Sequence, residues 1–143
     1  STHDERKIDC ITCIKLSDIS DICNDIVTPE FESAQVILIN EAQFFPDIKN
    51  WTICAIEKYN KHVYLCGLDG DHTREKFGDL LYLIPYCDEV KKLHSICTFC
   101  KKQAAIFTKR KVNHSCKSHG DDKQIIIGTD IYQPLCRNCY NIS

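Results

Sequence analysis

Apolar residues in the first half of the chain predict a strand, a helix and a second strand. Residues 36–39 are an uninterrupted, mostly β-branched apolar run, which predicts a strand buried on both faces. Residues 62–68 predict a second buried strand. Between them, apolar positions recur at helical spacing, at Ile48, Trp51, Thr52, Ala55, Ile56 and Tyr59. A strand, helix and strand with short links predict a parallel crossover, so the predicted fold class is α/β.

Each of these predicted strands stops at polar residues. Asn40 and Glu41 follow the first strand, and Asp69 follows the second. The carboxyl ends of parallel strands meet at one edge of a sheet, where open α/β folds bind their ligands. We therefore expect Glu41 and Asp69 to project at the same edge. Two carboxylates there suit a divalent cation or a general base, although acidic residues at strand ends are also common in ordinary loops.

Other segments give weaker patterns. Residues 7–15 alternate in polarity and predict a strand with its cysteines in the core. Ser17 is a plausible N-cap for a short helix that ends at Pro29. Residues 78–84 predict helical turns stopped by a proline, and residues 89–96 predict another strand.

Two CxxC knuckles are the strongest spacing signal in the chain. Paired CxxC turns bring four thiolates to a closed tetrahedral Zn²⁺ site, which has no open position for catalysis. Predicted strands at residues 104–109 and 124–127 lie between the knuckles, which predicts a zinc ribbon with structural zinc. A redox dithiol and a set of unmetallated thiols are the alternatives. The predicted ligands are Cys97, Cys100, Cys136 and Cys139.

Composition narrows the class of protein. The 143 residues suit one compact domain with a small appendage, and the formal net charge of −2 gives no footprint for nucleic acid. A basic cluster at residues 109–111 is either a solvated loop edge or a phosphate contact. We expect a soluble cytoplasmic protein with no membrane segment, and the eleven cysteines fit a reduced compartment better than a disulfide framework. The chain begins with Ser1 and contains no methionine, so we expect a truncated protein.

A series of short motifs runs in a fixed order along the chain. They are Asn40-Glu-Ala-Gln-Phe-Phe-Pro46, Leu68-Asp-Gly, Phe77-Gly, Leu83-Ile-Pro85, and the two CxxC knuckles around Thr108-Lys-Arg, Gly128 and Tyr132. Their order and spacing resemble the type II (cellular and poxvirus-like) thymidine kinase family from Ser1 to Tyr140. The resemblance implies a P-loop α/β kinase-like domain over residues 1–96 and a zinc-binding lasso domain over residues 97–143. It also implies a homo-oligomer, a tetramer or a dimer.

The resemblance further implies an activity and roles for individual residues. The family transfers the γ-phosphoryl group of ATP to the 5′-hydroxyl of thymidine with Mg²⁺, for deoxynucleoside salvage and DNA synthesis. Glu41 matches the family's general base. Asn40 and Asp69 match its Mg²⁺-associated positions, and the match of Asp69 is the weaker of the two. The implied partners are thymidine and ATP, with no nucleic acid and no membrane. The substrate-binding positions implied are Phe44, Leu68 and Phe77 around the thymine ring, and Thr108, Ile127, Gly128 and Tyr132 in the lasso.

The sequence also departs from the family pattern. It contains no Gly-x-x-x-x-Gly-Lys-Ser/Thr loop, which the family carries ahead of the segment that matches Ser1. Asn40 replaces an aspartate, His72 replaces an aromatic residue near the thymine pocket, and Ile127 replaces a glycine of the lasso. We expect either a kinase whose N-terminal part is missing here or a catalytically inactive pseudoenzyme that serves as a structural or binding subunit. A helicase fragment or a nucleic-acid-binding ribbon is disfavoured, because a helicase needs more chain and the ribbon lacks a consistent basic face.

Overall fold

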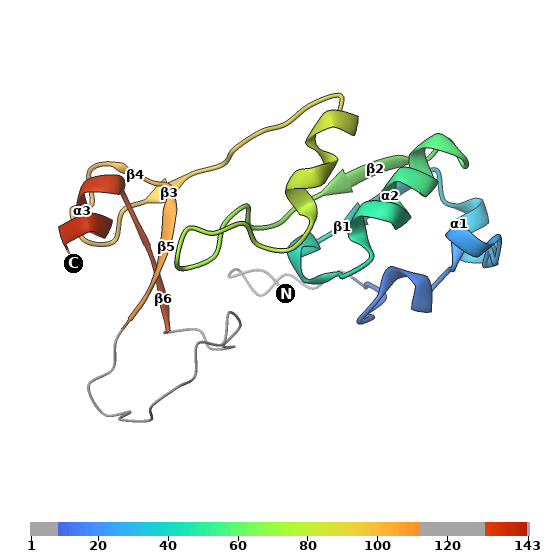
Figure 1. The fold of residues 1–143 in the computed structure, drawn as a ribbon, viewed down its shortest axis with the longest axis horizontal. Coiled ribbons are helices and arrows are strands. Elements are labelled where there is room, and N and C mark those ends of the chain that lie inside the picture. The colour runs from blue at the N-terminus through green and yellow to red at the C-terminus, as the bar shows by residue number, and fades with distance from the viewer. Residues whose placement is uncertain (1–8, 112–130, 143) are drawn as a thin grey trace. The chain divides into compact units, whose positions relative to one another are not determined.

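The computed structural model describes residues 9–111 and 131–142 (Figure 1). The chain divides into two compact units, Ser1–Gly67 and Leu68–Ser143. The predicted boundary at residue 97, between a kinase-like domain and a lasso domain, stays a prediction. No helix among the described residues is long and apolar enough to cross a membrane.

The first unit contains the predicted strand, helix and strand. Strands β1 (Val36–Ile39) and β2 (His62–Leu65) pair in parallel, from Val36 opposite His62 to Ile39 opposite Leu65. Helix α2 (Ile48–Glu57) connects them, as Figure 1 shows. The predicted α/β class with a parallel pair is therefore confirmed. Strand β2 ends earlier than the predicted residue 68, because the hydrogen-bonded ladder to β1 ends with β1.

Helix α2 buries the apolar stripe that predicted it. Ile48, Trp51 and Ala55 have exposed fractions of 4% or less. The Trp51 indole Nε1 donates a hydrogen bond to the Ser20 carbonyl at 2.9 Å, and its ring meets that of Phe31 edge-on at 5.6 Å. The predicted packing role of Trp51 is confirmed.

The prediction that β1 is buried on both faces is wrong. Val36 is 53% exposed and Leu38 76% exposed, and Tyr64 beside Leu38 on β2 is 65% exposed. Alternate residues of a strand point to opposite faces, and Ile39 on the other face is buried. Only one face of this two-stranded sheet is therefore covered among the described residues.

The segment before β1 is built from short helices rather than from the predicted strand and helix. Residues 9–15 contain no strand, and Cys10 is exposed. Thr28 begins a helix instead of ending one, because its hydroxyl accepts a hydrogen bond from the Phe31 N–H at 3.4 Å. The helices are η1 (Leu16–Asp18), η2 (Ile22–Asn24) and α1 (Pro29–Ser33).

The second unit has two short antiparallel strand pairs. β3 (Ser95–Ile96) pairs with β4 (Ala104–Ala105), and β5 (Phe107–Arg110) pairs with β6 (Tyr132–Leu135). The hairpin expected between the CxxC knuckles is thus present, although its return strand is β6. The strand predicted at 124–127 lies outside the described residues. Of the strand predicted at 89–96, only β3 forms.

Two helices complete the second unit. The 3₁₀ helix η4 (Leu80–Tyr86) contains Pro85, which was expected to stop it. Helix α3 (Arg137–Ile142) follows the second knuckle. One buried cluster of this unit is unusual in composition, because cysteine supplies three of its five members: Cys97, Ala105, Leu135, Cys136 and Cys139.

Candidate active site and metal centre

Glu41 lies in the turn that follows β1. Its backbone has φ 53°, in the left-handed region, which costs an L-residue about 1–2 kcal/mol. The turn is fixed to β2, because the Cys66 N–H donates to the Ile39 carbonyl and the Ala42 N–H donates to the Cys66 carbonyl, each at 2.9 Å. Strained backbone of this kind is concentrated at functional sites. The Glu41 side chain is exposed at the carboxyl end of the strand, as predicted.

Gln43 orients the Glu41 carboxylate. It belongs to the short helix η3 (Ala42–Phe44), is only 4% exposed, and donates from Nε2 to Glu41 Oε2 at 2.7 Å. Among the described residues, no hydrogen bond engages the second carboxylate oxygen, so it can accept one from another donor, such as a hydroxyl group. Sequence reasoning assigned no role to Gln43. The sequence does contain a hint of this role, because Gln43 is an amide residue between apolar residues, two positions after Glu41.

The two predicted Mg²⁺-associated residues have different surroundings. Asn40 is exposed beside Glu41 in the first unit. Asp69 belongs to the second unit, where its carboxylate forms an ion pair with Lys92. The expectation that Glu41 and Asp69 share one edge of the sheet stays a prediction.

Asp71 organises the loop that follows Asp69. Its side chain is 8% exposed, and Oδ1 accepts hydrogen bonds from the Thr73 N–H at 2.8 Å, the Thr73 hydroxyl at 2.6 Å and the Glu75 N–H at 3.0 Å. A backbone bridge between Gly70 and Lys76 closes the loop. Sequence reasoning missed Asp71, although an aspartate two residues before a threonine is the signal of an Asx turn.

The substrate-binding residues implied by the resemblance differ in exposure. Phe77 is buried at 7%, whereas Phe44 is 44% and Leu68 is 43% exposed. Thr108 and Tyr132 are half-buried on the paired strands β5 and β6, which brings them into one hairpin. The last two positions, Ile127 and Gly128, lie outside the described residues.

The four predicted cysteine ligands come together in the second unit. Their sulfur atoms all lie within 4.8 Å of one another, and three of the four residues are buried. The Cys100 and Cys136 sulfurs are 4.0 Å apart. Zn–S bonds of about 2.3 Å in a tetrahedron separate sulfurs by roughly 3.8 Å, so this set fits a tetrahedral metal ion. The predicted grouping of Cys97, Cys100, Cys136 and Cys139 is confirmed.

The surroundings of the cluster shift the pKa values of two of its thiols in opposite directions. Burial raises the pKa of Cys97, but backbone N–H groups around it, including that of Cys136, outweigh burial and lower the pKa to about 6. For Cys139, burial dominates, and the other cysteines of the cluster raise the pKa further, to about 12. Cys97, with its lowered pKa, is readily deprotonated for a metal, whereas Cys139, with its raised pKa, needs the metal to become a thiolate.

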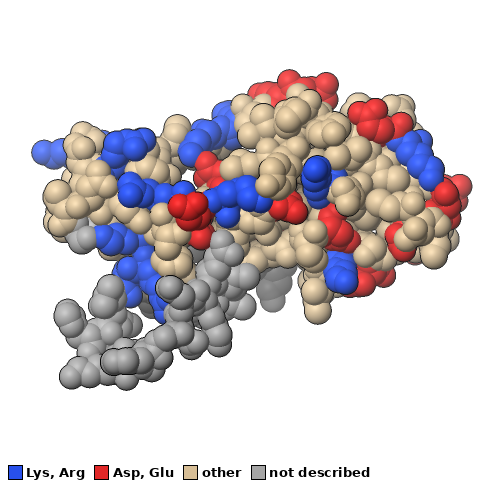
Figure 2. Space-filling view, viewed as in Figure 1, with Lys and Arg blue, Asp and Glu red and all other residues tan. Residues whose placement is uncertain are grey.

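The ribbon around this cluster is basic. The segments 97–111 and 131–142 contain no Asp or Glu, and Figure 2 shows Lys and Arg side chains over this part of the chain. Whether these residues form one consistent basic face is not settled by their number, so the expectation that the ribbon lacks such a face stays a prediction. A metal ion with four thiolates is negatively charged, so nearby cations offset its charge. The basic residues are Lys101, Lys102, Lys109, Arg110, Lys111 and Arg137.

With the carboxylate turn and the cysteine cluster described, the sequence can be compared with known proteins. The thymidine kinase family model matches residues 1–140. The chain belongs to the thymidine kinase family. A thymidine kinase of Oryza sativa is 37% identical over 139 residues, which cover 97% of this chain and 48% of the rice protein.

Viral members of the thymidine kinase family are similar to the same degree. The thymidine kinase of vaccinia virus (strain Ankara) is 35% identical over 140 residues, covering 97% of this chain and 70% of the viral protein. That of Yaba monkey tumor virus is 38% identical, covering 97% and 68%. The chain thus spans about half the length of the rice relative and about two thirds of the viral ones.

Proposed function

We propose that this chain is part of an ATP-dependent thymidine kinase, which transfers the γ-phosphoryl group of ATP to the 5′-hydroxyl of thymidine. Besides family membership, the observation that supports the proposal is the exposed Glu41 carboxylate at the end of β1, with one oxygen bound by Gln43. The other carboxylate oxygen of Glu41 accepts the proton of the 5′-hydroxyl group. The hydroxyl oxygen then attacks the γ-phosphorus of ATP. The backbone of the turn fixes this carboxylate, so little reorganisation is needed.

Mg²⁺ neutralises charge on the phosphates in such a reaction. In this chain, Asn40 and Asp69 are the residues proposed to associate with the ion. An amide oxygen is a weaker ligand for Mg²⁺ than a carboxylate, and Asp69 is paired with Lys92. Each residue is therefore proposed as a weak contact to the ion, with water and phosphate oxygens as its main ligands.

The cysteine cluster is proposed to hold structural Zn²⁺ in a lasso domain over residues 97–143. The four sulfurs leave no open coordination position, so the metal stabilises the fold and takes no part in the chemistry. We further propose that the α/β unit belongs to a P-loop kinase fold. We also propose a cytoplasmic homo-oligomer, a tetramer or a dimer. Phe44, Leu68, Phe77, Thr108, Ile127, Gly128 and Tyr132 are the proposed thymidine contacts.

Phosphoryl transfer by the complete protein tests this function. Zinc-loaded protein is incubated with γ-labelled ATP, Mg²⁺ and either thymidine or 5′-deoxythymidine, which lacks the accepting hydroxyl. We expect label on thymidine and none on 5′-deoxythymidine. Thymidine binding without any transfer would contradict the kinase proposal and favour the inactive binding subunit instead.

A further inference from the structure

His72 lies in a loop that is fixed from two sides. Asp71, the residue before it, anchors the loop through three hydrogen bonds from Thr73 and Glu75. The His72 carbonyl accepts a hydrogen bond from the Tyr140 hydroxyl of α3 at 2.7 Å. These contacts fix the position of the His72 backbone in the loop.

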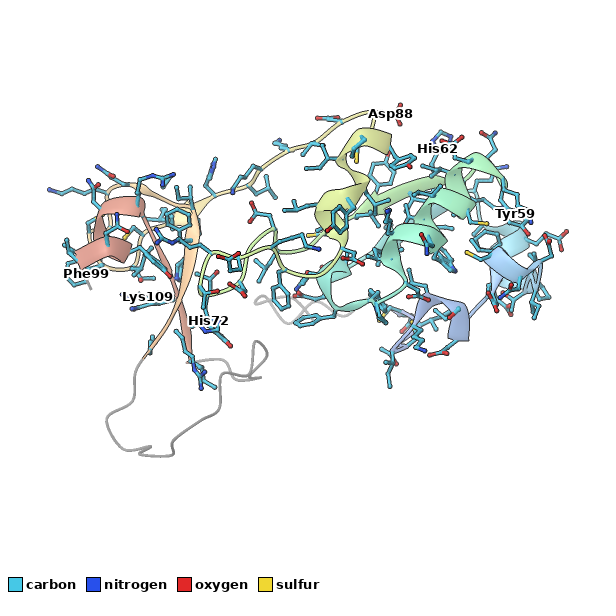
Figure 3. The ribbon with its side chains drawn as sticks, viewed as in Figure 1. Tyr59, His62, His72, Asp88, Phe99 and Lys109 are labelled. Atoms are coloured by element: carbon cyan, nitrogen blue, oxygen red, sulfur yellow. The ribbon has the colours of Figure 1, made fainter. Side chains whose placement is uncertain are left out.

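The His72 imidazole lies against strand β6. Its ring centroid is 6.2 Å from that of Tyr132, with the two planes tilted by 55°. Figure 3 shows His72 beside the strands of the β5–β6 hairpin. Tyr132 is one of the residues that we propose to contact thymidine, so His72 lies next to a proposed thymidine contact.

One atom of this ring lacks a partner. His72 Nδ1 is buried and makes no hydrogen bond in the part of the chain that the structure describes. Burying a polar atom without a partner opposes folding, and native proteins rarely keep such atoms without a functional reason. Phenylalanine would fill nearly the same space beside Tyr132 without this cost. The retention of an imidazole here therefore points to a partner that arrives with a ligand.

We infer that His72 Nδ1 forms a hydrogen bond to the base of a bound pyrimidine 2′-deoxynucleoside and contributes to the choice of base. This inference rests on the proposed function. Pyrimidine bases present both carbonyl acceptors and ring or amino donors at their edge, and a neutral imidazole can donate or accept at Nδ1 according to its tautomer. An imidazole next to the aromatic ring of Tyr132 suits a planar, neutral, polar ligand.

Three substitutions separate the hydrogen bond from the shape of the ring. His72→Phe keeps a flat ring without nitrogen, His72→Asn retains a polar atom near the position of Nδ1, and His72→Gln retains one near the position of Nε2. Thymidine affinity is measured by calorimetry, without ATP, on the complete zinc-loaded protein. We expect about a five- to tenfold weaker affinity for Phe and Gln, and an affinity within about twofold of wild type for Asn.

The thermal stability of the ligand-free protein should respond to His72→Phe in the opposite direction from thymidine affinity. We expect His72→Phe to unfold at the same or a higher temperature than wild type, because it removes an unpartnered buried atom. A residue that only supports the fold would lose stability and affinity together. His62→Phe is the matched control, because His62 is exposed on β2 and should leave thymidine affinity unchanged.

The outcomes separate this inference from the proposed function. Equal thymidine affinity of the wild type and His72→Phe would overturn the role of His72, even if the protein phosphorylates thymidine. A wild type that neither binds nor phosphorylates thymidine would overturn both. The ¹⁵N chemical shift of His72 Nδ1 in the wild type gives a test that needs no variant to fold. We expect it to move when thymidine is added, and an unchanged shift at saturation would overturn the inference.

Discussion

At the scale of single residues, Glu41 is the group on which the proposed chemistry depends. Glu41→Gln keeps the size and the hydrogen-bonding reach of the side chain but cannot accept a proton at pH 7. We expect thymidine phosphorylation to fall by about 10²–10⁴-fold with thymidine affinity changed by less than about threefold, because only proton acceptance is lost. Single-turnover kinetics and calorimetry measure the two effects separately.

Glu57→Gln is the control for this substitution, because Glu57 is an exposed carboxylate at the end of α2. It should leave turnover unchanged. Turnover near the wild-type rate in Glu41→Gln would remove Glu41 from the role of base. Sequence reasoning reached Glu41 because a buried apolar run and its abrupt polar end are both visible in a few adjacent residues. The supporting contacts of Gln43 and Asp71 depend on local backbone turns, which hydrophobic periodicity does not show.

At the scale of elements, Asp47 connects the N-terminal segment to the start of α2. Its two carboxylate oxygens accept hydrogen bonds from the Leu16 N–H at 3.1 Å and the Ser17 N–H at 2.9 Å. Partial burial raises the pKa of Asp47, but these backbone donors outweigh it and lower the pKa below its ordinary value of 3.8. Thus a residue 30 positions away fixes η1, which no local pattern along the segment could predict.

We predict that Asp47→Asn destabilises the first unit by about 1 kcal/mol, because an amide offers one acceptor oxygen in place of two. Urea unfolding followed by Trp51 fluorescence measures this, since Trp51 is the single tryptophan and is buried in this unit. Asp9→Asn, at an exposed position, is the control. An unchanged unfolding midpoint in Asp47→Asn would show that the two hydrogen bonds add nothing to stability.

The lowered pKa of Asp47 also sets the sign of a pH effect. The folded state binds the proton of Asp47 less tightly than the unfolded state does. The stabilisation is therefore complete above the unfolded pKa near 3.8 and is lost as the pH falls through the lower folded value. We expect the stability difference between wild type and Asp47→Asn to shrink as the pH is lowered below about 4. A difference that is constant from pH 6 to pH 3 would contradict this assignment.

Element prediction succeeded where one segment contains its own signal and failed where a partner is needed. Helix α2 has a stripe of apolar residues at helical spacing, and this stripe is buried. Residues 89–96 have a strand-like pattern, but only Ser95–Ile96 find a partner strand, in β4. The exposed face of β1 shows the same limit, since an apolar run predicts burial without identifying the element that covers it.

At the scale of the whole molecule, the two units differ in what holds each core together. Ile22, Ile48 and Trp51 form an apolar core in the first unit. In the second unit, three of the five clustered buried residues are cysteines. The four-cysteine set was predictable although Cys100 and Cys136 are 36 positions apart, because metal ligation dictates the spacing within each knuckle. The length of the intervening loop carries no such constraint, so the spacing did not locate β6, and the strand predicted at 124–127 lies outside the described residues.

This difference predicts a selective response to metal removal. Structural zinc contributes about 10 kcal/mol or more to small domains, and without it four crowded thiols remain in place of an apolar core. We expect a chelator, or Cys97→Ser, to abolish hydrogen-exchange protection in β5, β6 and α3, while α2 stays protected and Trp51 fluorescence is unchanged. Cys87→Ser, at an exposed cysteine of the same unit, should retain both metal and protection. Full metal content in Cys97→Ser would argue against the four-cysteine centre, and equal loss of protection in α2 would show that the two cores do not unfold separately.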